Sequence, residues 1–257
     1  MIKLASMTWQ YHELSLERAL EGISRAGFRY VALGLPHQGV DVPNEHDESS
    51  VETIQALLQK YELEPVMLIA NQQFKPGQPL SRAIGRLEAA KALGIKEMLS
   101  VGTSSYRKFP DEMFTEEEIA PVNQEFAEHF KIIADEAAAR DLLVSLKPHT
   151  GNTATAGTIV STLKQIDKPN VGGSYDPGNV QYYEGVDAAE DFPKMATRTH
   201  SLLIKDHRGK RAEKDFPIPG EGDVDFQKIF NTLKEVHFQG NVVVERVDTD
   251  FSNAPEV

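Results

Sequence analysis

Short apolar runs alternate with longer amphipathic stretches along the chain. In the segment 15–27, apolar residues recur at i, i+3, i+4 and i+7 from Leu16, and Gly27 follows as a helix C-cap. The segment 79–94 repeats this pattern and ends on Gly94. The apolar runs predict eight strands, at 2–7, 30–35, 65–70, 97–102, 142–147, 171–176, 200–206 and 241–247.

Strands that alternate with helices predict parallel pairing. The runs show little strict alternation, which suits strands covered by helices on one side and by a barrel interior on the other. Eight such units in 257 residues is the count of a (β/α)8 barrel, the α/β fold known as the TIM barrel. An open doubly wound sheet is the alternative, but MTWQYHE stands where its Gly-rich dinucleotide fingerprint would follow the first strand. We therefore predict a single TIM-barrel domain over residues 1–257.

The end of the chain departs from the regular pattern. After the eighth run only DTDFSNAPEV remains, which is too short and too polar for an eighth outer helix. The sequence therefore predicts that this helix is missing or truncated. Either the chain stops early or a neighbouring subunit covers that flank, which would make the protein a homo-oligomer.

The charge balance favours a small-molecule partner. Lys plus Arg number 27 and Asp plus Glu number 39, and the net charge of −12 would repel nucleic acid and anionic lipid. The chain has no cysteine, which excludes disulfides and thiolate metal sites. No signal-peptide core and no apolar run of membrane-spanning length is present, so a cytoplasmic location is expected.

Polar side chains stand at the carboxyl ends of the later runs, where TIM barrels carry their chemistry. Lys147 and His149 lie two residues apart and so face the same side of an extended chain. Asp176 ends the sixth run, although turn chemistry alone would also explain it. Glu245 stands between valines and Arg246 in the eighth run, where burying a carboxylate without a partner costs several kcal/mol. Glu245 is therefore the strongest candidate for a functional role.

Further candidates lie at the same end of the predicted barrel. His207 follows the seventh run, with a solvated loop position as its plain alternative. Arg246 faces away from Glu245 and is assigned to the helix layer. A tryptophan at the mouth could stack on a sugar face. The residues predicted to contact a substrate are Lys205, Glu221, His37, Trp9 and Asn71.

Three motifs carry a resemblance to a known family. KPNVGGSYDPGN at 168–179, LLIKDHRG at 202–209 and IPGEGDVDFQKIFNTLKEVHFQGNVVVER at 218–246 resemble the xylose isomerase-like TIM-barrel superfamily. That superfamily includes sugar phosphate isomerases and epimerases, ketose 3-epimerases, hydroxypyruvate isomerase, inosose dehydratase and endonuclease IV-like proteins. The resemblance is strong over 140–246 and compatible over 1–139. It implies a TIM barrel and a divalent cation (Mn, Mg, Co or Zn) held by Glu, Asp, His and Glu on strands five to eight.

This chain departs from the implied ligand set at two positions. Asp176 and Glu245 match, but Lys147 stands where many members have the Glu of LExH, and Leu203 where they have the His of HxKD. Three interpretations stay open. A metal is held by substituted ligands, or the ammonium of Lys147 replaces the metal's charge, or the protein is a non-catalytic sugar-binding protein with a degenerate metal site. In the first case the ligands are Asp176, Glu245, His149 and His207.

The implied chemistry is proton abstraction next to the carbonyl of a keto sugar or sugar acid, through an enediolate. Glu245 is the first candidate for the base, and His149 is the alternative acid or base. Isomerase or epimerase activity would result, and a lyase or decarboxylase using Lys147 on an oxo-sugar acid is the alternative. Lysine in place of a carboxylate favours an anionic substrate. A DNA-repair role is disfavoured by the net charge of −12.

Overall fold

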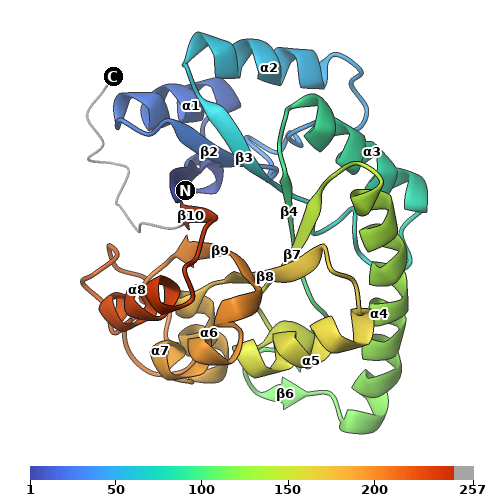
Figure 1. Cartoon of the computed structure of the whole chain (residues 1–257), viewed down its shortest axis with the longest axis vertical. Coiled ribbons are helices and arrows are strands. Elements are labelled where there is room, and N and C mark those ends of the chain that lie inside the picture. Colours follow the sequence, from blue (N-terminus) through green and yellow to red (C-terminus); the bar gives the residue numbers. More distant parts are fainter. Residues whose placement is uncertain (246–257) are drawn as a thin grey trace.

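Eight parallel strands close into a barrel in the computed structural model, which describes residues 1–245 of the chain (Figure 1). Each of the eight predicted apolar runs overlaps one barrel strand, and the prediction of a TIM barrel is confirmed. Around the barrel the strands follow the order β1-β10-β9-β8-β7-β4-β3-β2. Their bounds are β1 Lys3–Met7, β2 Tyr30–Leu33, β3 Glu64–Ile69, β4 Glu97–Val101, β7 Leu143–Lys147, β8 Val171–Tyr175, β9 Thr199–Ile204 and β10 Asn241–Val244.

Helices surround the barrel, and most begin with a capping side chain (Figure 1). Ser15 caps α1, Thr115 forms a capping box with Glu118 on α4, and Asp225 caps α8, so polar side chains satisfy the first amides of these helices. The α-helices are α1 Leu16–Arg25, α2 Ser50–Lys60, α3 Leu80–Ala92, α4 Glu116–Ala138, α5 Ala156–Ile166, α6 Pro177–Glu184, α7 Ala188–Asp191 and α8 Phe226–Glu235. The 3-10 helices are η1 Thr8–Tyr11, η2 Gly151–Thr153, η3 Phe192–Lys194 and η4 Ala196–Arg198.

A short antiparallel hairpin interrupts the alternation between β4 and α4. Its strands are β5 Tyr106–Lys108 and β6 Glu112–Met113. Arg211, from the loop after β9, donates to the hydroxyl of Tyr106 at 2.9 Å and to the carbonyl of Pro110 at 3.0 Å. The hairpin is therefore tied to a loop that lies far away in the sequence. The predicted absence of an eighth outer helix, and the assignment of Arg246, concern residues outside 1–245.

The barrel interior has a polar layer at the amino ends of the strands and an apolar layer above it. The apolar layer contains Met7, Met67, Leu203 and Val243, all 2% exposed or less. Below it, the carboxyl group of Glu97 accepts hydrogen bonds from Ser145 at 2.7 Å, Ser201 at 2.6 Å and Asn241 at 2.8 Å. Burial raises the pKa of Glu97, although these donors oppose the shift. The apolar layer thus separates Glu97 from the carboxyl ends of the strands.

The free energy of unfolding of the wild-type protein is expected to fall as the pH rises, and Glu97→Gln is expected to abolish that fall. Because the pKa of Glu97 is raised in the folded state, the stability that its protonated carboxyl group contributes is fully present below the unfolded-state pKa. That stability is lost as the pH rises through the folded-state pKa. Urea midpoints at pH 5 and pH 8 would measure this, with the exposed Glu52→Gln as control. A midpoint for Glu97→Gln well below that of the wild type at pH 8 would contradict the prediction.

Candidate active site

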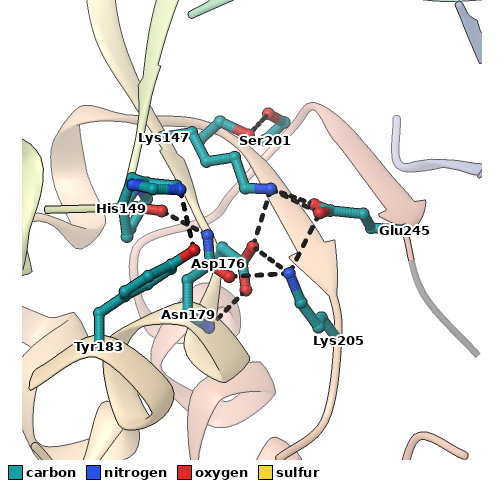
Figure 2. Close-up of polar contacts among 10 residues, drawn as sticks. Lys147, His149, Asp176, Asn179, Tyr183, Ser201, Lys205 and Glu245 are labelled. Atoms are coloured by element: carbon teal, nitrogen blue, oxygen red, sulfur yellow. Dashed lines mark hydrogen bonds and ion pairs between the residues drawn. The ribbon is translucent and has the colours of Figure 1, made fainter. Parts of the chain in front are cut away.

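Four charged side chains converge at the carboxyl ends of neighbouring strands (Figure 2). Lys147 is the last residue of β7. Asp176 directly follows β8, Lys205 directly follows β9 and Glu245 directly follows β10. Their exposed fractions are 9%, 0%, 7% and 6%, so water is largely excluded from their charges. We call these four residues the charged cluster.

The ammonium of Lys147 lies at the centre of the charged cluster. Its Nζ is 2.5 Å from both Oε1 and Oε2 of Glu245 and 3.0 Å from Oδ2 of Asp176. Burial opposes the charged form, but Glu245 and Asp176 outweigh it and raise the pKa of Lys147. Both oxygens of Glu245 accept hydrogen bonds from this ammonium, whereas Oδ2 of Asp176 forms an ion pair with it and has no hydrogen-bond partner within residues 1–245. Lys147 is therefore a cation held between two carboxylates.

Lys205 is held less tightly by the same carboxylates. Its Nζ lies 3.3 Å from Oε1 of Glu245 and 3.8 Å from Oδ2 of Asp176, and it donates to Oδ1 of Asn179 at 2.7 Å. The ammonium also lies 5.3 Å from the ring centroid of Phe216, within cation–π range. Lys205 therefore keeps hydrogen-bonding capacity for a further acceptor.

Asn179 joins the charged cluster to β7, although the sequence analysis did not single it out. Its side-chain amide donates to the carbonyl of Pro148 at 2.7 Å, and its backbone amide donates to Oδ1 of Asp176 at 2.9 Å. Asp176 is thereby the N-cap of α6, with Pro177 in the first turn. The DPGN motif was the available signal, because an Asp followed three residues later by Asn places that amide on the capping carboxylate.

The two carboxylates of the charged cluster titrate differently. Burial opposes ionisation of Glu245, but Lys147 and Lys205 overcome it and lower its pKa to about 2. Burial raises the pKa of Asp176, and Lys205 and Lys147 only partly offset that effect. Glu245 is therefore a permanent anion at neutral pH, while Asp176 accepts a proton more readily than an ordinary aspartate.

His149 lies beside the charged cluster and pairs with Tyr183 of α6. Its Nε2 is 2.9 Å from the hydroxyl of Tyr183, and the ring centroids are 4.3 Å apart. Burial, assisted by Lys147 and Lys205, lowers the pKa of His149 to about 4. Burial raises the pKa of Tyr183 to about 12. At neutral pH the pair is therefore a neutral imidazole beside a neutral hydroxyl, and no sequence signal pointed to Tyr183.

A cavity of about 490 Å³ opens next to His149. Asn71 also lines it, and within residues 1–245 its buried Oδ1 has no hydrogen-bond partner. Thr103, Thr150 and Phe126 are also among the residues that line it. The structure thus brings Asn71 and His149 together, and the free oxygen of Asn71 suits a ligand that donates a hydrogen bond.

The other predicted site residues do not line this cavity. His37 donates through Nδ1 to the carbonyl of Leu14 at 3.0 Å and lines a separate cavity of about 260 Å³ beside α1 and α2. Trp9 packs against the apolar interior layer and stacks on His12 with ring centroids 5.5 Å apart. Glu221 is exposed. None of these three residues therefore contributes to the cavity beside His149.

The loop after β9 is organised by Asp206. Its buried carboxylate accepts hydrogen bonds from four backbone amides, those of His207 at 2.8 Å, Gly220 at 2.8 Å, Gly222 at 2.9 Å and Val224 at 3.1 Å. A Cβ on Gly222 would lie 2.2 Å from this carboxylate, so only glycine fits there. The GEGD motif is therefore the partner of Asp206 in fixing the loop that follows Lys205.

The divalent cation implied by the resemblance does not fit these side chains. Lys147 stands between Glu245 and Asp176, and an ammonium has no lone pair for a metal. His207 binds the carbonyl of Glu213 through Nε2 at 2.8 Å and packs between aromatic rings. Across the part of the chain that the structure describes, no three His, Asp or Glu side chains gather with metal-binding geometry. The residues predicted as ligands, Asp176, Glu245, His149 and His207, are therefore not brought together as a metal site in residues 1–245.

The closed barrel, with the charged cluster at the carboxyl ends of its strands, defines a TIM-barrel protein. The chain belongs to the xylose isomerase-like TIM barrel family, whose model matches residues 20–257. Across residues 1–245, none of the helices has both the length and the apolar character needed to span a membrane.

Curated relatives in this family include inosose dehydratases. The Clostridium perfringens (strain 13) enzyme is 32% identical over 111 residues, which cover 35% of this chain and 37% of the relative. The Yersinia enterocolitica enzyme is 29% identical over 145 residues, covering 48% of this chain and 47% of the relative. These matches span less than half of the relatives' length.

Solved structures share the fold at lower identity. The IolI protein with a bound zinc atom aligns with a TM-score of 0.76 at 19% identity, covering 97% of this chain and 90% of that one. A D-tagatose 3-epimerase-like protein aligns with a TM-score of 0.75 at 15% identity, covering 96% of this chain and 91% of that one. The probable 3-DHS dehydratase AsbF of Bacillus anthracis aligns with a TM-score of 0.72 at 15% identity, covering 96% of this chain and 94% of that one. At these identities the likeness is one of fold.

Proposed function

We propose that this protein is an enzyme that removes a proton from the carbon next to the carbonyl of a keto sugar or sugar acid. The resulting enediolate takes the proton back on the other face or on the other carbon, which makes the enzyme an epimerase or isomerase. The observation that carries the proposal is a neutral His149 that lies beside two buried lysines and lines a cavity of about 490 Å³. The family membership and the epimerases among the structural neighbours support it.

Lys205 is the group that we assign to the developing oxyanion. Its contacts to the carboxylates, at 3.3 and 3.8 Å, are longer than those of Lys147, so it can turn toward a substrate oxygen at lower cost. A preorganised cation in a site that excludes water stabilises such charge strongly. Lys147 then keeps Glu245 ionised and holds both carboxylates in place without contacting the substrate itself.

His149 is favoured over Glu245 as the base. Both oxygens of Glu245 are engaged by Lys147, and a carboxylate whose pKa is about 2 is a weak proton acceptor. The neutral imidazole of His149 acts as the base in the tautomer whose Nε2–H donates to Tyr183, because Nδ1 then carries the lone pair. Tyr183 thus orients the ring, and its hydroxyl accepts the hydrogen bond when His149 is in the form that acts as the base.

A dehydratase is the second candidate, because the curated relatives described above are inosose dehydratases. The first step is the same proton abstraction by His149. The enolate then expels a hydroxyl from the adjacent carbon, and the protonated His149 returns its proton to that hydroxyl, so that water leaves. A decarboxylase or lyase that uses Lys147 as a nucleophile is less well supported, since its amine stays protonated between two carboxylates. For the same reason, Lys147 adds no excess positive charge that would select an anionic substrate.

Incubation in D2O with a panel of keto sugars, keto polyols and oxo-sugar acids is expected to exchange one carbon-bound proton next to a carbonyl. Proton NMR would detect the exchange and would also distinguish an epimer or isomer from a dehydrated product. His149→Asn should slow the exchange by about 10²–10⁴-fold, because general base catalysis contributes about that much. The exposed His237→Asn is the matched control. If no compound on the panel exchanges, the proposed function is lost.

The acid limb of the exchange rate is expected near pH 4, well below the ordinary histidine value of about 6.5. Protonation of His149 removes the base, and burial together with Lys147 and Lys205 delays that protonation to lower pH. The rate should therefore rise from about pH 4 and stay flat through neutral pH. A pH–rate profile of the wild type checks this, and an acid limb near 6.5 would mean that His149 is not the base.

A further inference from the structure

Two substitutions at the barrel mouth belong together. Relative to the ligand pattern of the resembled family, Lys147 stands in place of a glutamate and Leu203 in place of a histidine. Leu203 is fully buried in the apolar interior layer, and it lies two residues before Lys205 on β9. Compared with that pattern, this chain has a hydrocarbon where the nitrogen ligand would be and a cation where one carboxylate would be.

The charges of the two arrangements balance. A glutamate and a divalent cation together carry one positive charge, and the ammonium of Lys147 also carries one. The remaining carboxylates, Asp176 and Glu245, are present in both arrangements. One lysine therefore replaces one carboxylate and one dication without changing the net charge of the site. The raised pKa of Lys147 agrees with a permanent cation at this position.

The geometry of Lys147 matches that replacement. Its Nζ contacts three carboxylate oxygens at 2.5, 2.5 and 3.0 Å, which is the position from which a cation would bridge Glu245 and Asp176. A dication entering beside it would face two ammonium groups, Lys147 and Lys205, inside a buried site where like charges repel strongly. Both of the available carboxylates are thus already neutralised by the chain's own cations.

We infer that the ammonium of Lys147 permanently replaces the divalent cation, so that this protein neither binds nor needs a metal at the barrel mouth. The inference concerns what occupies the site, and it holds whichever reaction the protein catalyses. Metal uptake would therefore contradict this inference and leave the proposed function unaffected. The absence of proton exchange would contradict the proposed function and leave this inference unaffected.

The test measures binding of Mn²⁺ and of Zn²⁺ to the purified full chain by calorimetry and by the unfolding temperature, after EDTA treatment. The wild type is expected to bind neither ion at the cluster and to keep the same unfolding temperature in EDTA and in metal. Asp176→Asn separates the cluster from surface sites. Uptake of one ion per chain by the wild type, lost in Asp176→Asn, would overturn the inference.

Lys147→Glu combined with Leu203→His rebuilds the ligand pattern and serves as the positive variant. It is expected to bind one Mn²⁺ per chain and to gain roughly 5 °C or more in unfolding temperature at about 100-fold excess over the dissociation constant. Lys147→Glu alone should bind more weakly, because Leu203 supplies no ligand. If the double variant does not fold, the measurement on the wild type still tests the inference. Failure of the wild type to bind Mn²⁺ and Zn²⁺ at the cluster supports the inference, and binding of either ion there refutes it.

Discussion

Lys147→Met is expected to lower the free energy of unfolding by about 3–5 kcal/mol, the usual cost of breaking a buried ion pair by removing one partner. Methionine keeps the length and apolar stem of lysine, so the change isolates the charge. It would leave Glu245 and Asp176, 6% and 0% exposed, without the cation that contacts three of their oxygens. The loss should therefore come from uncompensated carboxylates.

Urea unfolding at pH 7 would measure this loss, and its pH dependence would reveal its origin. In the wild type the pKa of Glu245 is lowered to about 2 from an ordinary 4.5, so its stabilising contribution is present above pH 4.5 and lost as the pH falls toward 2. The difference between wild type and Lys147→Met should accordingly shrink at acid pH. Adding Glu245→Leu to Lys147→Met should recover much of the stability, because the stranded anion is then removed.

Lys168→Met is the matched control for this prediction. Lys168 pairs with Asp135 at 2.6 Å on the surface, where such pairs contribute about 0–1 kcal/mol. If Lys147→Met costs no more than Lys168→Met, the charged cluster does not depend on Lys147 as we describe.

Lys205→Met is expected to reduce the rate of proton exchange by about 10²–10³-fold while costing much less stability than Lys147→Met. The rate loss reflects removal of the donor that we assign to the oxyanion, and losses of this size follow removal of one such donor. The smaller stability loss follows because Lys147 still contacts both carboxylates after the change.

The rate and the unfolding midpoint of Lys205→Met need to be measured together. The exposed Lys91→Met on α3 is a control that should leave both unchanged. A Lys205→Met protein with wild-type exchange would remove Lys205 from the mechanism. One that is as unstable as Lys147→Met would show that the two lysines share the same structural role.

The barrel itself was predictable because its signal repeats. Each strand is a short apolar run between helix caps and glycines, and eight repeats leave few alternative folds. The β5–β6 hairpin was missed, because its two short strands are largely exposed and carry no apolar pattern. Strand parity also identified the inward-facing Lys147 and Glu245, since both lie on or directly beside a regular strand.

Parity failed where the chain leaves the strand. β9 ends at Ile204, so His207 lies three residues into a loop, and its ring turns to the carbonyl of Glu213 instead of the charged cluster. Asn179 and Tyr183 reach the site from α6, so their roles depend on how that helix is placed after β8. No periodicity in a single sequence reports such contacts between elements. The resemblance implied a metal, and the contacts of Lys147 and His207 argue against it.

The four amide hydrogen bonds to Asp206 have a consequence for ligand association. They order the loop after β9 within the folded protein, so the conformational entropy of those residues is lost during folding and not on binding. Phe216, which packs against Lys205 and His207, is carried by this ordered loop. A ligand should therefore associate with this side of the mouth without a slow closing step, and differences in affinity among ligands should arise mainly from their dissociation rates.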